Sequence, residues 1–140
     1  MSKNSVEIIL AKLQRLDEYI SYLKELAAYP QRTFIGDHHI YGLAERYLHL
    51  CIEIMLDVGK LFIIERGLPR PENSHEIFEL LARHKVISQA LFKRIRGMAG
   101  FRNILVHDYM KVDRGIVYRQ TKSGLKDLVA LRKAFLSKLG

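Results

Sequence analysis

The chain has 140 residues, of which 49% are hydrophobic, and its formal net charge at pH 7 is +8. This size is sufficient for a continuous core, and we expect a single domain over residues 1–140. The one cysteine, Cys51, excludes an intrachain disulfide and is typical of a buried thiol in a reducing compartment. No apolar stretch reaches the roughly 18 residues of a membrane span, and no signal peptide is recognisable, so we expect a cytoplasmic protein without an anchor.

The positive charge is unevenly distributed along the chain. Residues 1–66 contain 8 Lys/Arg and 9 Asp/Glu, a net charge of −1, whereas residues 67–140 contain 15 and 6, a net charge of +9. Such a basic half favours a phosphate-rich partner such as RNA, with binding that weakens in salt. A charge excess that only keeps the protein soluble explains the composition equally well.

Two long helices are predicted in the first half of the chain. Apolar residues recur at three- and four-residue spacing over residues 4–28, with Asn4 as a plausible N-terminal cap and Pro30 beyond the end. A similar pattern over residues 37–66 predicts the second helix. A short link over residues 30–36 would fold the two helices back in antiparallel orientation.

The second half is predicted to be helical in three further stretches. A short helix is expected over residues 73–84, a longer one over residues 88–106 and a final one over residues 125–139, while residues 113–124 look less regular. Because no alternating strand pattern is visible, the fold class expected is all-α, an antiparallel bundle of about five helices. Gly97 and Gly100, inside the fourth helix, require either a close helix contact or a local break.

The fourth helix carries Arg102, His107 and Tyr109. If the helix continued to Tyr109, Arg102 and Tyr109 would share one face, whereas His107 would be rotated about 140° from Arg102. One copy of the helix therefore does not bring Arg102 and His107 together. Two copies related by a two-fold axis would, because each supplies its own set to a shared cleft.

These residue types are those that cleave RNA without a metal. The reaction needs a base for the 2′-hydroxyl, an acid for the leaving 5′-oxygen and a cation for the charge on phosphorus. Two His107 imidazoles, one neutral and one protonated, can divide the proton transfers, and the guanidinium of Arg102 fits phosphate oxygens. The plainer alternatives are a solvated helix end for His107, an ion pair for Arg102 and a packing role for Tyr109.

A resemblance to a known family favours the first interpretation. Arg102, His107 and Tyr109 resemble the R-x4-H-x-Y signature of the HEPN superfamily, and residues 97–103 and 47–59 resemble its HepT-like (DUF86) branch. The resemblance implies a homodimeric ribonuclease toxin, paired with a nucleotidyltransferase antitoxin in a type VII-like system. It also implies that Arg102 and His107 are catalytic and that Tyr109 accepts AMP, which would switch the enzyme off by placing an anion beside Arg102.

The resemblance leaves an alternative open, a non-catalytic HEPN module that binds a nucleotide, RNA or the nucleotidyltransferase partner. Asn103 matches the Arg-Asn pair that is usual in the family, and its amide is expected to hold a phosphate or the helix end. Asp108 occupies a variable position and is assigned no role. No cofactor is expected.

The second helix carries Glu45, His49, Glu53 and Asp57 at intervals of four residues, so they form one stripe. The stripe could bind a metal, but a solvated or ion-paired face is the more usual reason for it, and we expect no metal site. A third interpretation is that Glu53 and Asp57 contact the fourth helix and orient Arg102. The remaining histidines, His38, His39, His75 and His84, are expected to be surface or capping residues.

Overall fold

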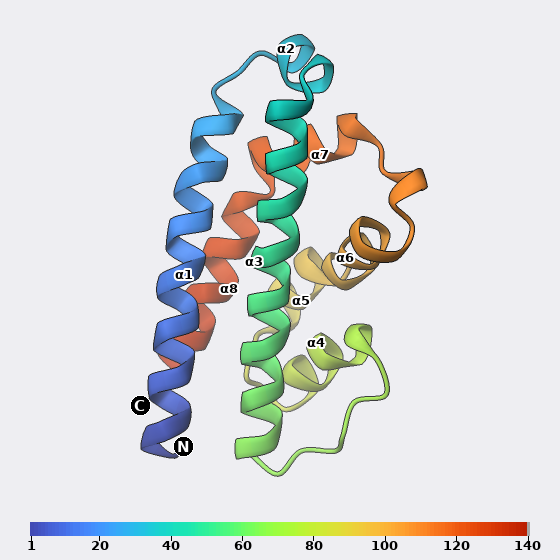
Figure 1. Cartoon of the computed structure of the whole chain (residues 1–140). Helices are drawn as coiled ribbons and strands as arrows, with labels where there is room; N and C mark the ends of the chain where they lie inside the picture. Colours follow the sequence, from blue (N-terminus) through green and yellow to red (C-terminus); the bar gives the residue numbers. More distant parts are fainter. Residues whose placement is uncertain (140) are drawn as a thin grey trace.

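The computed structural model describes residues 1–139, which form an all-α bundle without a strand in that range. The long helices α1 and α3 lie side by side and run in opposite directions, and α4, α5 and α6 lie on the other side of α3 (Figure 1). In chain order the elements are α1 (Lys3–Ala27), α2 (Gln31–Gly36), α3 (His38–Glu65), α4 (Ser74–Arg83), α5 (Gln89–Ile95), α6 (Met98–His107), the 3-10 helix η1 (Tyr109–Lys111), α7 (Arg114–Ser123) and α8 (Leu125–Ser137).

The two long helices were predicted to within two residues, although the cap of the first was not. The N-cap of α1 is Ser2, whose hydroxyl accepts from the backbone N–H of Ser5 at 3.1 Å, and not Asn4. The hydroxyls of Ser2 and Ser5 also donate to Glu65 at the far end of α3. These contacts tie the start of one long helix to the end of the other. The link between the helices contains the short helix α2, which buries Phe34 in the core.

The fourth predicted helix is two helices, α5 and α6, with Arg96 and Gly97 between them. Gly97 therefore marks the local break, whereas Gly100 lies inside α6. Residues 114–123, expected to be less regular, form α7, which Asp113 caps by accepting from the backbone N–H groups of Gly115 and Ile116. The break at Gly97, the short helix α2, the 3-10 helix η1 and the helix α7 explain why residues 1–139 form more helices than the five expected.

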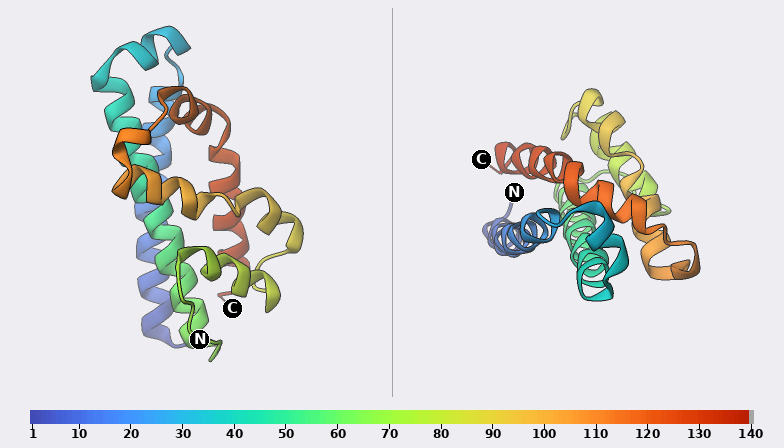
Figure 2. Two further views of the ribbon diagram at one scale, coloured as in Figure 1. Left: turned by 90° about the vertical axis from the view of Figure 1, so that its right-hand side faces the viewer. Right: turned by 90° about the horizontal axis from the view of Figure 1, so that it is seen from above.

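The buried side chains form one cluster, to which α1, α3, α4 and α8 contribute most. The two further views show α8 on the side of α1 and α3 that faces away from the viewer in Figure 1, and α6 crossing α3 on the opposite side from α1 (Figure 2). Cys51 is completely buried in α3, and burial raises the pKa of its thiol to about 12. The expectation of a structural thiol is confirmed.

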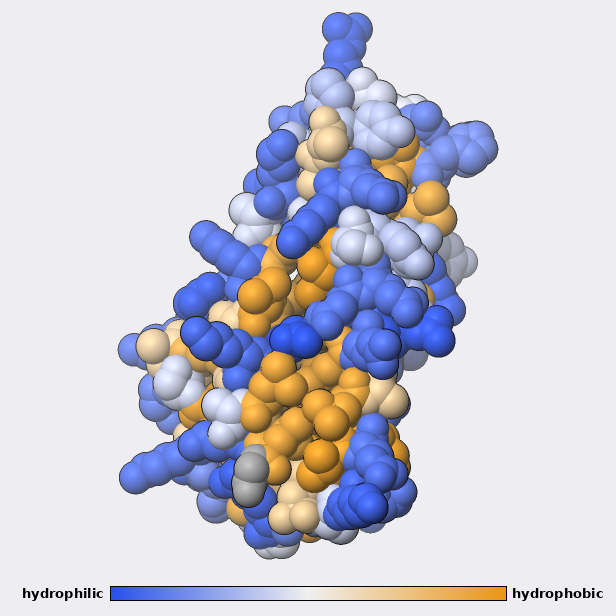
Figure 3. Space-filling model, turned by 90° about the vertical axis from the view of Figure 1, so that its left-hand side faces the viewer, coloured by the Kyte–Doolittle hydropathy of each residue, from blue (hydrophilic) through white to orange (hydrophobic). Residues whose placement is uncertain are grey.

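The face formed by α1 and α8 is not uniformly polar. Hydrophobic side chains form a broad area in the lower half of this face, bordered by polar ones (Figure 3). Exposed hydrophobic residues on these two helices include Ile8, Leu10 and Val129. No helix among residues 1–139 is both long and apolar enough to cross a membrane.

Candidate functional site at the contact between α3 and α6

Arg102 lies in the middle of α6 and is held by two side chains. Its Nε donates to Oε1 of Glu53 on α3, and its Nη1 donates to Oδ1 of Asn103 at 2.9 Å. The side chain of Arg102 is 21% exposed and that of Glu53 is 30% exposed, so the pair lies at the molecular surface with one side accessible. Nη2 takes part in neither contact. The guanidinium is therefore fixed in orientation while one of its donor groups stays available to an anion.

Glu53 also contacts a histidine that the sequence did not single out for this site. Nε2 of His49 lies 3.5 Å from Oε1 of Glu53, the same oxygen that accepts from Arg102. On its other side, Nδ1 of His49 lies 3.3 Å from Nη1 of Arg46. The four side chains thus form a continuous polar chain from Arg46 to Arg102. The four-residue spacing between His49 and Glu53 was the available signal, but it did not reveal the contact with Arg102.

Asp57 does not belong to this row of interacting side chains. Its carboxylate accepts from Nζ of Lys12 on α1 at 3.3 Å. The contact with Arg102 that was expected of both carboxylates is thus present for Glu53, whereas Asp57 pairs with Lys12 instead. One turn of α3 separates the two carboxylates, and this turn is enough to direct Asp57 toward α1 rather than α6.

His107 is the last residue of α6, and its side chain is exposed. It makes no hydrogen bond or ion pair with Arg102 among residues 1–139, as the rotation of about 140° between them predicts. The helix ends before Tyr109, which begins η1 and is 72% exposed. The expectation that Tyr109 shares a helical face with Arg102 is therefore wrong, because it assumed that the helix continued.

A groove between α1 and α3 lies next to this site, because Glu53 lines both. This surface groove has a volume of about 330 Å³. It is lined by the two ion-paired carboxylates, by two basic side chains and by apolar and aromatic side chains of the two helices: Ala11, Lys12, Arg15, Tyr19, Leu50, Glu53, Ile54 and Asp57. A stacked aromatic pair, Tyr19 and Tyr47, lies beside it with ring centroids 5.7 Å apart. The groove therefore brings polar and apolar surface to the edge of the Arg102 site.

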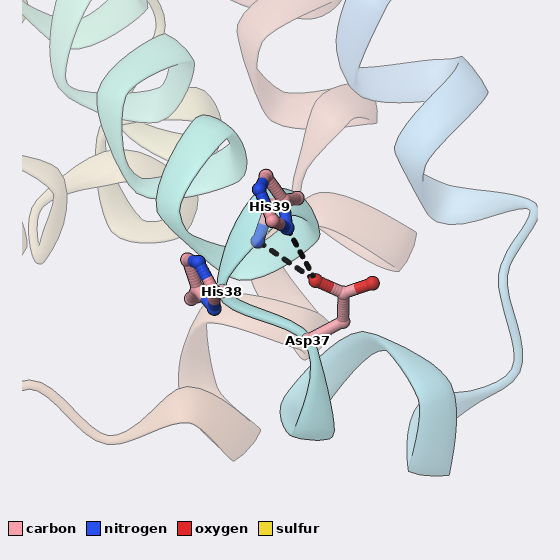
Figure 4. A group of neighbouring side chains, drawn as sticks. All are labelled: Asp37, His38 and His39. Atoms are coloured by element: carbon pink, nitrogen blue, oxygen red, sulfur yellow. Dashed lines mark hydrogen bonds and ion pairs between the residues drawn. The ribbon is translucent and has the colours of Figure 1, made fainter.

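The predicted stripe on α3 does not converge on a possible metal site. Glu53 is engaged by Arg102 and Asp57 by Lys12. Among residues 1–139, ligand atoms of three such residues gather only at Asp37, His38 and His39, at the start of α3 (Figure 4). There Asp37 caps the helix, accepting from the backbone N–H of His39 at 2.9 Å, and it lies 3.2 Å from the ring nitrogen Nδ1 of the same residue. Asp37 is therefore the cap, and His38 and His39 are exposed, as predicted for surface residues.

Comparisons with known proteins identify relatives of this chain among ribonucleases. The chain is 34% identical over 121 residues to the mRNA nuclease HepT of Shewanella oneidensis, a match covering 86% of this chain and 90% of the relative. It is 23% identical to the tRNA nuclease HepT of Aphanizomenon flos-aquae over 79% of this chain and 76% of the relative.

Solved structures with a similar fold include toxins of toxin–antitoxin pairs. The tri-AMPylated HEPN toxin of Shewanella oneidensis, in complex with an MNT antitoxin, superposes with a TM-score of 0.86 at 25% identity, covering 99% of this chain and all of the other. A toxin–antitoxin structure with AMP-PNP has the same fold, with a TM-score of 0.87, 24% identity and coverage of 94% and 99%. The family described as "Ribonuclease HepT-like" matches residues 16–135. The chain therefore belongs to the HepT-like family of the HEPN superfamily.

Proposed function

We propose that this protein is a metal-independent ribonuclease toxin that acts as a homodimer and is switched off by adenylylation of Tyr109. The observation that carries the proposal is the presentation of Arg102, whose Nε and Nη1 are held by Glu53 and Asn103 while Nη2 takes part in neither contact. A guanidinium fixed in this way is suited to a phosphate that gains negative charge during the reaction. Its relatives named as mRNA and tRNA nucleases support RNA as the substrate.

The division of labour at the scissile phosphate follows from the chemistry of the two side chains. One neutral His107 removes the proton of the 2′-hydroxyl, which attacks phosphorus, and a second, protonated His107 donates a proton to the departing 5′-oxygen. Arg102 stabilises the charge that develops on the phosphate oxygens. The products are a 2′,3′-cyclic phosphate and a free 5′-hydroxyl. DNA lacks the 2′-hydroxyl and is not cleaved.

The need for two imidazoles makes a second copy of the chain part of the site. In one protomer the exposed His107 makes no contact with Arg102, and a single imidazole cannot be acid and base at the same time. The face that best fits this partner is the outer side of α3, where apolar residues recur at seven- and four-residue intervals at Leu43, Leu50 and Ile54. Leu43 is 46% exposed, and Leu50 and Ile54 are half-buried. Pairing across this face places Glu53 and Arg102 at the rim of the interface.

Adenylylation of Tyr109 is supported by the exposure of its side chain and by the AMPylated Shewanella relative, which is bound to an MNT antitoxin. Tyr109 lies two residues beyond His107, outside the helix, where an enzyme can reach its hydroxyl. An AMP group there adds a phosphate close to a site built to attract phosphate. The modified residue thus competes with RNA for the same cationic groups.

The decisive test is the substitution His107→Ala. We expect the variant to lose RNA cleavage and growth inhibition, because both proton transfers depend on this side chain, and to keep its dimeric state. His84→Ala is the matched control, since His84 is exposed at the C-terminal end of α4. Cleavage at the wild-type rate by the His107 variant would contradict the proposal. Cleavage by neither variant nor wild type, with RNA still bound, would favour the non-catalytic module instead.

A further inference from the structure

The Arg102 ion pair is contacted by His49, and no hydrogen bond or ion pair joins it to His107 among residues 1–139. Nε2 of His49 is 3.5 Å from Oε1 of Glu53, and this oxygen also accepts from Nε of Arg102. The side chain of His49 is 22% exposed, similar to that of Arg102. The carboxylate of Glu53 therefore has two neighbours: the guanidinium of Arg102, which is always charged, and the imidazole of His49, which is charged only when protonated.

Arg46 determines which nitrogen of His49 carries the proton. A guanidinium can only donate, so Nδ1 of His49, 3.3 Å from Nη1 of Arg46, must accept. The neutral ring then carries its hydrogen on Nε2, which faces Glu53. Neutral His49 is thereby oriented as a donor toward the carboxylate that holds Arg102.

Burial and the neighbouring charges together lower the pKa of His49. Desolvation is the largest influence and lowers its pKa below the ordinary 6.5, while Glu53 raises it and both Arg46 and Arg102 lower it. These three residues are the charged groups that face the ring, two from α3 and one from α6. Protonating His49 breaks its hydrogen bond with Arg46 and adds a second cation beside Glu53.

We propose that His49 is a positioning residue of the ribonuclease site, whose proton controls how firmly Glu53 holds Arg102 and hence how readily Arg102 pairs with RNA phosphate. When His49 is neutral, Arg102 is the main cationic partner of Glu53, and an RNA phosphate must compete with that carboxylate. When His49 is protonated, it takes over part of the negative charge of Glu53. Arg102 is then more available to phosphate. This inference rests on the proposed function, because it assigns the phosphate to Arg102.

The first test uses no activity measurement. The Nε–H signal of Arg102 is followed by nitrogen-15 NMR from about pH 5 to about pH 8, together with the ring signals of His49. The His107→Ala background is used so that His49 is the site's only titrating imidazole. We expect the Arg102 signal to move with the same midpoint as His49 and to stay flat in His49→Gln, which keeps a donor but cannot titrate. If the chemical shift of Arg102 does not change as His49 titrates, the inference is overturned, whether or not the protein cleaves RNA.

The second test is the pH dependence of cleavage in proteins with His107 intact. The ratio of wild-type kcat/KM to that of His49→Gln is expected to rise roughly three- to tenfold between about pH 8 and about pH 5.5. Taking the ratio cancels every pH effect that the two proteins share. The exposed His84→Gln variant should give a constant ratio. A constant ratio for His49→Gln would mean that His49 only supports the fold, whereas absent cleavage in wild type would count against the proposed function alone.

Discussion

Glu53 and Arg102 are separated by 49 residues in the chain, yet the carboxylate of the first accepts a hydrogen bond from Nε of the second. The contact joins the longest helix, α3, to the short helix α6. It matters because a free arginine side chain samples many rotamers, and a partly buried ion pair selects one of them. The orientation of the guanidinium is therefore set before any substrate binds.

Substituting Glu53 by Gln should lower RNA cleavage by about ten- to a hundredfold, because the ion pair that sets the rotamer of Arg102 is lost altogether and Arg102 no longer meets the phosphate in the reactive geometry. Protonation of His49, in contrast, only weakens this ion pair and leaves the hydrogen bond that orients Arg102 in place. Asp57→Asn is the matched control on the same helix. Its carboxylate pairs with Lys12 rather than Arg102, and the pair is 35% and 40% exposed, so its loss should change cleavage little. Initial rates on one RNA substrate measure both effects. Equal rates for the two variants would contradict the positioning role of Glu53.

Introducing a charge into the outer face of α3 should separate the subunits. Leu50→Asp places a carboxylate in the proposed interface, and we expect a monomer that retains its helical circular dichroism but does not cleave RNA. Val129→Asp is the control, because Val129 is 47% exposed on α8, away from the outer face of α3. Size-exclusion chromatography with light scattering reports the mass. A dimeric Leu50→Asp protein would place the interface elsewhere, with the apolar area on the α1 and α8 face as the next candidate.

Removing the hydroxyl of Tyr109 should prevent adenylylation. After co-expression with the nucleotidyltransferase partner, wild type is expected to gain the mass of one or more AMP groups, whereas Tyr109→Phe should gain none and remain toxic. Tyr29→Phe, at another exposed tyrosine, should be modified like wild type. Intact-protein mass spectrometry measures all three. An unmodified wild type, or a modified Tyr109→Phe, would refute Tyr109 as the acceptor.

Chelators should leave cleavage unaffected. Two of the three carboxylates of the α3 stripe, Glu53 and Asp57, are already engaged by Arg102 and Lys12, and among residues 1–139 the stripe does not gather three ligand atoms. Cleavage in EDTA is expected at the rate seen without it, with products that end in cyclic phosphate. Loss of activity in EDTA, restored by a divalent ion, would instead revive the stripe on α3 as a metal site.

Two glycines should respond to alanine in opposite directions. A Cβ at Gly59 would lie 2.8 Å from Cγ2 of Ile77, which is buried, so Gly59→Ala should lower the free energy of unfolding by about 1–3 kcal/mol. A Cβ at Gly100 would lie 3.3 Å from Cε1 of His75, which is exposed and can move. Gly100→Ala should therefore raise the stability by up to about 1 kcal/mol through helix propensity. Urea denaturation measures both, and changes of the same sign would refute this reading.

Much of the fold could be predicted because helical periodicity and turn residues are local properties of the sequence. The pattern over residues 4–28 and 37–66 identified α1 and α3, and the short helix expected over residues 73–84 corresponds to α4, which Asn73 caps. The division of the fourth helix was harder, since Gly97 and Gly100 are both compatible with a continuous helix. Only the tertiary structure shows that the chain breaks at the first and continues through the second.

The candidate site was predictable as a motif but not as a set of contacts. Arg102, His107 and Tyr109 lie close in sequence, and their types indicate the chemistry. The partners of Arg102 come from α3, and which carboxylate of the stripe reaches it depends on how α6 crosses that helix. Sequence periodicity places Glu53 and Asp57 on one face, but it does not determine which neighbouring helix each one meets. His49 was overlooked for the same reason.

The end of α6 at His107 has a consequence for regulation. Because Tyr109 belongs to a short 3-10 turn rather than to the helix, a nucleotide attached there strains no backbone hydrogen bond of α6. Under the proposed adenylylation of Tyr109, the inactive and active proteins would therefore share one fold and differ only in the attached AMP. The protein could then be stored fully folded, and activation would require hydrolysis of the AMP linkage rather than synthesis of a new chain.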